Sequence, residues 1–144
     1  MTTQRHYGAA PLQPHELERL LKRRLRYGLR ASRLLDCPEL IEFLCPEVED
    51  PSRGLYDRAL VAEGRIAEAV ERIGGKPAQA LRVLFGLDDG TVGLSLQERR
   101  KLAGQILARK ARLVSEVTFA KNYEKILIRD LNVELWRASQ ASDT

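Results

Sequence analysis

Residues 14–35 read PHELERLLKRRLRYGLRASRLL, and the leucines of this stretch decide the fold class. They recur at the spacing of helical turns, which places them on one side of an α-helix: Leu17, Leu20, Leu21, Leu25, Leu29 and Leu34. No proline follows Pro14 within the stretch, so nothing in it is expected to interrupt helical hydrogen bonding. The sequence therefore predicts a first helix over 14–35.

Two further helices are predicted before the middle of the chain. Asp36 is a candidate cap for a short helix that has Pro38 in its first turn and ends before Pro46. Asp50 is also followed by a proline, and we expect it to cap a helix over 51–73. The glycine pair 74–75 then ends this helix, because glycine readily adopts the left-handed conformation common at helix ends.

Three helices are predicted for the second half of the chain. A short helix spans 77–85, and a glycine-rich loop follows over 86–95. Ser95 and Glu98 have the spacing of a capping box, in which each side chain bonds the other residue's backbone N–H at the start of a helix. After a stretch of weaker periodicity, the last helix is expected over about 116–137, again with a leucine seam.

This pattern predicts an all-α fold, a single-domain bundle of about six helices. No segment shows the strict alternation of a half-buried strand, and a chain of 144 residues suits one domain. Residues 1–13 are expected to form a flexible arm, and residues 138–144 a flexible tail. Between them the helical domain spans 14–137, with N-terminal helices over 14–75 and a C-terminal half over 77–137.

Composition and cysteine usage limit the classes of protein. No apolar run approaches the roughly 20 residues of a membrane span, and the N-terminus lacks the apolar core of a signal peptide. We therefore expect a cytoplasmic protein with no membrane partner. Cys37 and Cys45 are too few for a disulfide framework or a four-ligand zinc site. Reduced packing thiols are expected, and a two-cysteine metal or redox role is the alternative.

Residues that carry chemistry are few. His6 and His15 are the only histidines, and both lie in or beside the predicted arm, where a general base could not be held in place. No motif for phosphate, dinucleotide, zinc or serine-nucleophile chemistry is present. Asp88 and Asp89 resemble a metal-binding pair only weakly, because adjacent loop carboxylates more often form turns. We therefore expect no enzyme activity, catalytic residue, metal, cofactor or small-molecule substrate.

Charge is unevenly distributed along the chain, whose net charge is +4. Residues 14–35 contain seven arginines and lysines against two acids, whereas residues 39–73 contain nine acids against four arginines. The two segments can pair with each other inside the molecule. Alternatively, the basic first helix supplies contacts to the phosphates of a nucleic acid.

A second group of basic residues lies in the C-terminal half. Lys121, Lys125 and Arg129 follow one another at four-residue steps, which places them on one side of the last helix. Such a helix can enter the major groove of DNA, where an asparagine such as Asn122 can read adenine. The candidate DNA-binding residues are Arg99, Arg100, Arg109, Lys110, Arg112, Lys121, Asn122, Lys125 and Arg129. A solvated helix face is the alternative, and Arg99 and Arg100 can instead hold the preceding loop.

The segment 80–104, ALRVLFGLDDGTVGLSLQERRKLAG, resembles small helical, helix-turn-helix-like domains of actinobacterial regulatory and conflict-system proteins. The resemblance covers about 80–136. It rests first on Gly86, Leu87, Thr91, Gly93, Leu96, Arg99, Arg100 and Ala103, and then on Val114, Ser115, Thr118, Phe119, Lys121, Tyr123 and Glu124. It implies a bacterial, helix-turn-helix-like end over 77–137. The connection over 107–114 departs from the family, since it is longer than the usual tight turn and has no glycine.

Two functions are consistent with these observations. The first is a non-enzymatic, DNA-binding transcriptional regulator that uses the basic C-terminal helix. The second is a helical adaptor that binds another protein of a bacterial regulatory or defence system, or a second copy of itself. Exposed aromatic residues at Tyr27, Phe43 or Trp136 would favour the adaptor, because aromatic anchors contribute much of the binding energy of an interface.

Overall fold

The computed structural model describes residues 12–108 and 120–141, and within these ranges all regular structure is helical. The predicted all-α fold is confirmed. In chain order the elements are α1 (Pro14–Arg23), α2 (Ala31–Leu34), α3 (Pro38–Leu44), the 3₁₀ turn η1 (Glu47–Glu49), α4 (Leu55–Ile73), α5 (Gly75–Leu84), the 3₁₀ turn η2 (Asp89–Thr91), α6 (Leu96–Leu107), the π-helical turn η3 (Ala120–Glu124) and α8 (Lys125–Ala141).

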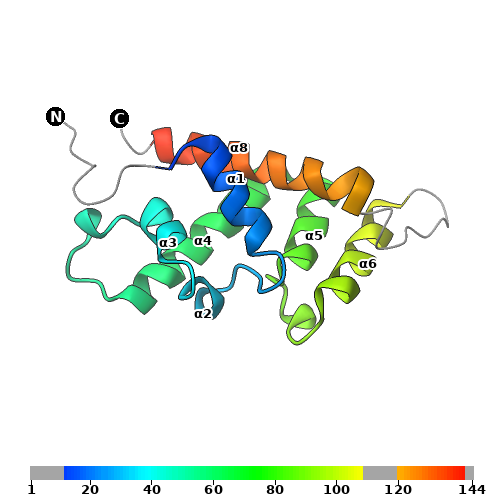
Figure 1. Cartoon of the computed structure of the whole chain (residues 1–144), viewed down its shortest axis with the longest axis horizontal. Helices are drawn as coiled ribbons and strands as arrows, with labels where there is room; N and C mark the ends of the chain where they lie inside the picture. The colour runs from blue at the N-terminus through cyan, green and yellow to red at the C-terminus, as the bar shows by residue number, and fades with distance from the viewer. Residues whose placement is uncertain (1–11, 109–119, 142–144) are drawn as a thin grey trace.

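Two long helices, α4 and α8, organise the described part of the molecule. They pack against each other, and α8 also packs against α1 and α3. Figure 1 shows α8 running along one side, with α1 crossing it. Helices α2, α3 and α5 contact α4, and α6 lies against α5. The first described helix is therefore joined in space to the last.

The predicted single helix over 14–35 is wrong, because the chain turns between α1 and α2. At the turn Gly28 has φ +89°, a left-handed conformation that side chains other than glycine rarely adopt. A Cβ atom at this position would lie 2.8 Å from the carbonyl oxygen of Phe85. The next backbone N–H, that of Leu29, donates to the same oxygen at 3.0 Å. The turn therefore fits the connection closely against the end of α5.

The leucine seam survives this break. Leu25 and Leu29 lie in the connection rather than in a helix, yet both are buried together with Leu17 and Leu21 of α1. The spacing of these four leucines is that of one side of a continuous helix. In the structure the chain turns after α1, and the same leucines are still buried. The hydrophobic spacing thus predicts which residues are buried in the core. It does not predict that the helix ends at Arg23.

The predicted cap of α4 is also wrong. Asp50 does not begin the helix, which starts at Leu55 with Gly54 at the cap. The Asp50 carboxylate instead accepts hydrogen bonds from the Ser52 hydroxyl at 2.8 Å and the Arg53 Nε at 2.9 Å. These two hydrogen bonds hold the pKa of Asp50 below its ordinary value, and the bond from Ser52 has the larger effect. The carboxylate closes a local turn that precedes the helix.

Three other helix ends differ from the sequence predictions. The cap of α3 is Cys37 rather than Asp36. Helix α5 begins at Gly75, directly after Gly74 has ended α4 with φ +71°. At the C-terminus α8 continues to Ala141, beyond the expected limit of the helical domain at 137.

The capping box is confirmed at the start of α6. The Ser95 hydroxyl accepts from the backbone N–H of Glu98 at 3.1 Å, and the backbone N–H of Ser95 donates to the Glu98 carboxylate at 2.8 Å. The hydrogen bond that the Ser95 backbone N–H donates to the Glu98 carboxylate, and then that between the Ser95 side chain and this carboxylate, lower the pKa of Glu98. Local sequence signals therefore predict this helix start correctly.

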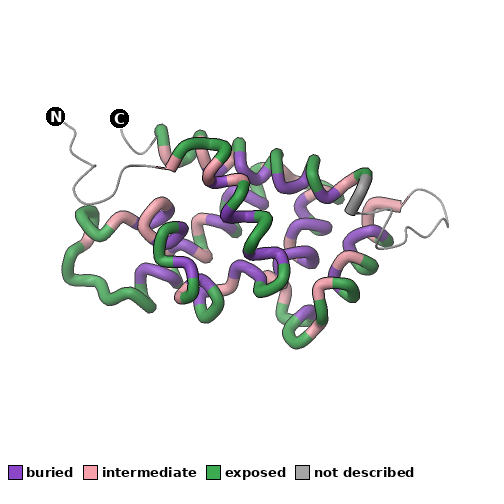
Figure 2. The backbone as a smooth tube through the Cα atoms, in the orientation of Figure 1, coloured by how far each residue is buried: buried purple, intermediate pink, exposed green. Residues whose placement is uncertain are grey.

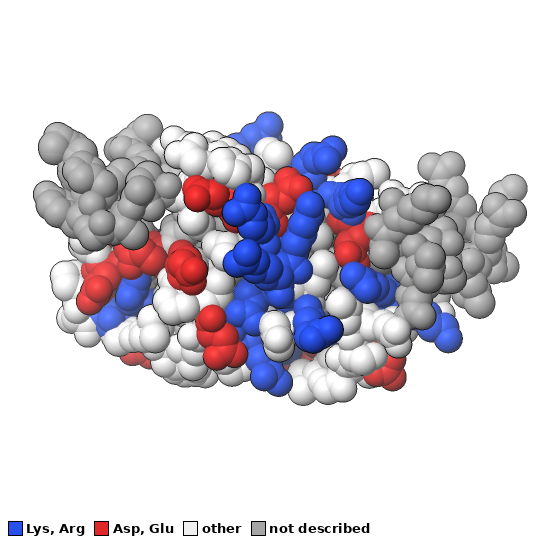
Figure 3. All heavy atoms as spheres, in the orientation of Figure 1, with Lys and Arg blue, Asp and Glu red and all other residues white. Residues whose placement is uncertain are grey.

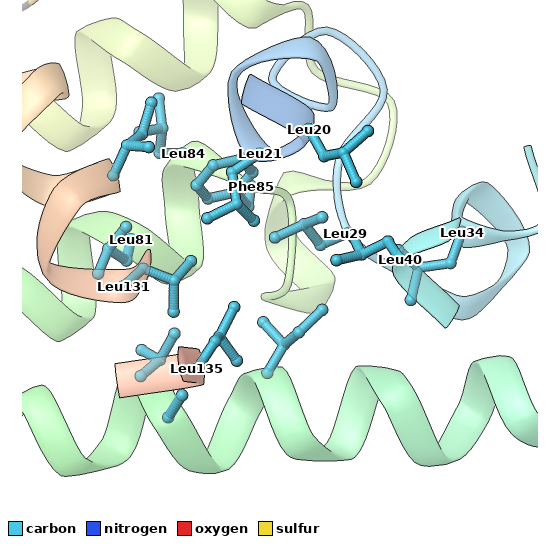
Figure 4. Close-up of a cluster of buried hydrophobic side chains, with 14 of the residues drawn as sticks. Leu20, Leu21, Leu29, Leu34, Leu40, Leu81, Leu84, Phe85, Leu131 and Leu135 are labelled. Carbon is cyan, nitrogen blue, oxygen red and sulfur yellow. The ribbon is translucent and has the colours of Figure 1, made fainter. Parts of the chain in front are cut away.

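The core forms where α1, α2, α3, α4, α5 and α8 meet. Figure 2 shows the buried residues on the inward sides of the helices. Figure 4 shows the side chains that meet there: Leu20, Leu21, Leu29, Leu34, Leu40, Leu81, Leu84, Phe85, Leu131 and Leu135. Each fully buried leucine contributes about 1.5–3 kcal/mol of transfer free energy. Cys37 and Cys45 are buried with unpaired thiols.

Candidate nucleic-acid interface

The outward face of α8 and the turn η3 before it carry three of the predicted DNA-binding residues. Lys125 and Arg129 lie one helical turn apart and are exposed, and Asn122 is exposed in the turn η3 before them. Within residues 12–108 and 120–141, neither Lys125 nor Arg129 has a carboxylate within ion-pair distance. The opposite side of α8 is fixed in the core by Leu127, Ile128 and other buried side chains. The two cations therefore project from a rigid support.

The segment before α8 differs from the predicted continuous helix over 116–137. Residues 120–124 form a π-helical turn, in which backbone bonds join residues five apart instead of four. Across such a turn, residues four apart no longer align as they do in an α-helix. Of the predicted stripe the structure describes the side chains of Lys125 and Arg129, and that of Lys121 lies outside the described part of the structure.

Arg100 points into the molecule rather than outward. Its Nε and Nη2 atoms donate to the two carboxylate oxygens of Glu124 at 2.7 and 3.0 Å. The pair joins α6 to η3, and the Glu124 side chain is only 10% exposed. A two-pronged, largely buried pair of this kind fixes the relative position of its elements. Residue spacing does not indicate this partner, because 24 residues separate Arg100 from Glu124.

Arg99 is buried, and its guanidinium binds three backbone carbonyl oxygens. These belong to Leu84 at the end of α5, to Arg26 at 2.9 Å in the connection after α1, and to Leu94 at 3.4 Å in the preceding loop. Burial, and then the charge of Arg100, lower the pKa of Arg99. The alternative that an early-helix arginine holds the loop is confirmed for Arg99. Neither it nor Arg100 contributes to the outward basic surface.

The remaining predicted site residues, Arg109, Lys110 and Arg112, fall in residues 109–119, which lie outside the described ranges. The two loop aspartates do have partners. Arg30 bonds Asp89 at 2.7 Å, and Arg82 lies 3.6 Å from Asp88. Among the residues that the structure describes, no group of three histidine, cysteine or acidic side chains could hold a metal ion.

A second basic surface lies on α1, the connection after it and α2. Its members are exposed and have no ion-pair partner among the described residues: Arg19, Arg23, Arg26 and Arg33. Figure 3 shows basic side chains gathered over α1 and the connection, and further ones over α8 in the same view. We call the four arginines the α1 basic face. Sequence composition indicates that this segment is cationic but does not show which of its cations are unpaired.

The expected internal pairing between the basic and acidic segments is not seen among the described residues. Lys22 pairs within its own helix with Glu18, and Arg30 pairs with Asp89, which belongs to neither segment. A backbone contact does join the two segments, since the N–H of Ala31 donates to Glu63 at 2.7 Å. The described ion pairs leave the positive charge of the α1 basic face uncompensated by the acidic residues 39–73.

The described surface thus offers unpaired cations on two adjoining helices, which suits a ligand with regularly repeated negative charges. No helix of the described ranges is long and apolar enough to cross a membrane. Comparison of the chain with models of protein families, with curated proteins and with solved structures gave no match.

Proposed function

We propose that this chain is a non-enzymatic, DNA-binding protein of the transcriptional-regulator type, and that the outward face of α8 contacts duplex DNA. The observation that supports this most directly is the pair of exposed, unpaired cations Lys125 and Arg129 on a helix whose other side is fixed in the core. An α-helix fits the major groove of B-DNA, where cations can meet phosphates and guanine edges.

Two neighbours of these cations suit base contacts. Asn122 is exposed and has the amide that pairs with adenine in the major groove. Ile126 is 54% exposed, and apolar side chains of this kind contact the thymine methyl group. In this proposal Lys125 and Arg129 provide affinity, and Asn122 and Ile126 provide sequence preference. The resemblance of residues 80–136 to helix-turn-helix-like domains agrees with this function.

The test is the salt dependence of binding to a random duplex, measured by fluorescence anisotropy. Wild-type affinity should fall steeply with salt, because binding releases counterions from the phosphates. The variant Lys125→Gln/Arg129→Gln should lower the slope of the log–log plot by about 1.8, at about 0.9 for each phosphate that is no longer neutralised. A wild-type protein whose binding is unchanged between low and physiological salt contradicts the proposal.

A matched control removes the same charge elsewhere. Arg53 and Arg65 lie in the acidic segment and have partly exposed side chains. Arg53→Gln/Arg65→Gln changes the net charge by the same two units as the α8 variant. It should retain the wild-type slope. A slope that falls equally in both variants means that net charge, and not the face of α8, governs binding.

A second candidate function is a helical adaptor, which a group of exposed apolar side chains favours. Leu55, Tyr56 and Leu60 on the first turns of α4 are each about half exposed, at 45, 51 and 46%. Of the aromatic residues named from the sequence, Tyr27 is 50% exposed, whereas Phe43 and Trp136 stack on each other with ring centres 6.2 Å apart. Apolar residues at such positions are typical of protein contacts.

Light scattering after size-exclusion chromatography distinguishes the two candidates. A monomer that binds DNA favours the regulator. Self-association that is lost in Tyr56→Ser/Leu60→Ser, with no binding to DNA, favours the adaptor.

A further inference from the structure

The α1 basic face consists of charges that the described structure does not use. Arg19 and Arg23 lie one helical turn apart on α1, and Arg26 and Arg33 follow in the connection and in α2. All four side chains are exposed and lack an ion-pair partner among the described residues. The arginines of residues 39–108 do have a carboxylate or carbonyl partner. Within residues 12–108, the arginines that lack such a partner are therefore confined to residues 14–35.

A buried cation adds to the positive charge at the same place. Arg24 is only 6% exposed, and its Nε has no hydrogen-bond partner among the described residues. Its guanidinium lies over the ring of Tyr27, 4.7 Å from the ring centre. A cation–π contact of this kind stabilises a guanidinium without neutralising it. No ion pair of the described residues includes Arg24, so its charge adds to that of the α1 basic face.

The α1 basic face lies beside the proposed DNA-contacting helix. Helix α1 packs on α8, and the side-chain amide of Asn132 in α8 donates to the carbonyl oxygen of Pro14 at 3.0 Å. Figure 3 shows the basic side chains over α1 and over α8 on the same face of the molecule. One extended polyanion can therefore contact both helices at once.

We infer that the α1 basic face is a second phosphate-binding surface, which holds the backbone of the same DNA duplex that α8 contacts. This inference rests on the proposed function. Arg19 and Arg23 are separated by about 6 Å along the helix axis. Phosphates follow one another at about 3.4 Å per strand along the duplex axis, so long arginine side chains at this separation can reach neighbouring phosphates. Contacts of this kind carry no sequence information and fix the orientation of the protein on DNA.

Other partners fit this surface less well. The apolar side of α1 is closed, since Leu17 and Leu21 are fully buried, so the helix has no face to insert into a membrane. Protein interfaces need an apolar or aromatic centre. Tyr27 is the only large apolar side chain among residues 12–35 that is exposed, and Arg24 covers one side of its ring. An almost purely cationic surface favours phosphates.

The experiment compares Arg19→Gln/Arg23→Gln with Lys125→Gln/Arg129→Gln and with the control Arg53→Gln/Arg65→Gln, in binding to a random duplex across a salt series. All three variants lose two charges. We expect the α1 variant to lower the log–log slope by about 1.8, as the α8 variant does, and the control to leave it unchanged. Across a set of duplexes of different sequence, the α1 variant should weaken binding uniformly, whereas Asn122→Ala should change the order of preference.

Each adverse outcome separates this inference from the function on which it rests. If the α8 variant lowers the slope and the α1 variant does not, the second surface is disproved and the proposed function stands. If the wild-type protein does not bind duplex DNA at low salt, both fail. If poly-glutamate displaces the duplex as effectively as unlabelled DNA does, the surface accepts acidic polymers in general, and the assignment to nucleic acid is overturned.

Discussion

Arginines of residues 14–35 and arginines of residues 39–73 differ in what they bind. In the acidic segment each of the four arginines has a carboxylate partner: Asp50 for Arg53, Glu42 for Arg58, Glu49 for Arg65 and Glu134 for Arg72. In the basic segment Arg30 alone among the arginines is paired within the described residues. The arginines of the acidic segment therefore contribute to contacts within the fold, whereas most of those in the basic segment have no ion pair among the described residues.

The largest loss of stability should follow when the contact between α6 and the basic segment is removed. Arg99→Met removes the donor for three carbonyl oxygens, one of them that of Arg26, and we expect a loss of about 3 kcal/mol in the free energy of unfolding. Urea denaturation measures it. Lys101→Ala, an exposed position on the same helix, serves as the control and should change stability by less than about 0.5 kcal/mol. Equal stability of the two variants would show that Arg99 does not fix the connection.

A smaller loss should follow in the acidic segment when a paired arginine is removed. Arg58 has a side chain only 9% exposed, and it donates to Glu42 and, at 3.0 Å, to the carbonyl oxygen of Cys45. We expect Arg58→Met to cost about 2 kcal/mol, reduced by the partial exposure of Glu42. The same substitution at the unpaired Arg33 should cost less than about 0.5 kcal/mol by denaturation. Similar losses of unfolding free energy at Arg58 and Arg33 would mean that the arginines of the two segments do not differ in their contribution to stability.

The pKa of Asp50 should show whether its carboxylate is bound by Ser52 and Arg53. Its carboxylate is held by Ser52 and Arg53, so its pKa lies below the ordinary value in the folded state. Because the folded pKa is depressed, this stabilisation is present above the unfolded pKa and is lost as the pH falls through the folded pKa. An NMR titration should therefore give a low midpoint, which rises toward the ordinary value in Ser52→Ala. An unshifted midpoint in the wild-type protein would contradict the pairing.

The smallest change in stability is expected for the α1 basic face. It tests most directly whether the basic and acidic segments differ in what their arginines do. Arg19→Gln/Arg23→Gln should leave the free energy of unfolding within about 0.5 kcal/mol of wild type, because these side chains are exposed and unpaired. Thermal denaturation checks it on the same protein used for DNA binding. A loss above about 1 kcal/mol would mean that the α1 basic face belongs to the fold, as the paired arginines of the acidic segment do.

Much of the fold could be predicted from local signals. The leucines of 14–35 enter the core as expected, and the capping box starts α6 at the predicted residue. These signals act over a few residues, so the sequence contains all that they need. The outward position of Lys125 and Arg129 follows in the same way from the leucine seam on the opposite side of α8.

The sequence predictions that were wrong concern the connection between α1 and α2 and the candidate site. They depend on contacts between residues far apart in the sequence and on a local change of helix type. The turn at Gly28 depends on the carbonyl oxygen of Phe85, and the inward direction of Arg100 depends on Glu124. The π-helical turn of η3 interrupts the α-helical spacing that the sequence predicts before Lys125. None of these can be derived from spacing, because periodicity records which side of a helix is buried and not which residue from elsewhere meets it.

The bond from Asn132 to the carbonyl oxygen of Pro14 joins residues 118 apart. At a translation rate of 5–20 residues per second, roughly 6–24 s pass between the synthesis of the two partners. During that interval α1 lacks the helix on which it packs. Helix α1 therefore cannot complete its packing until α8 has been made, and a product that stops short of α8 exposes the side of α1 that packs on it to chaperones, proteases and other unfinished chains.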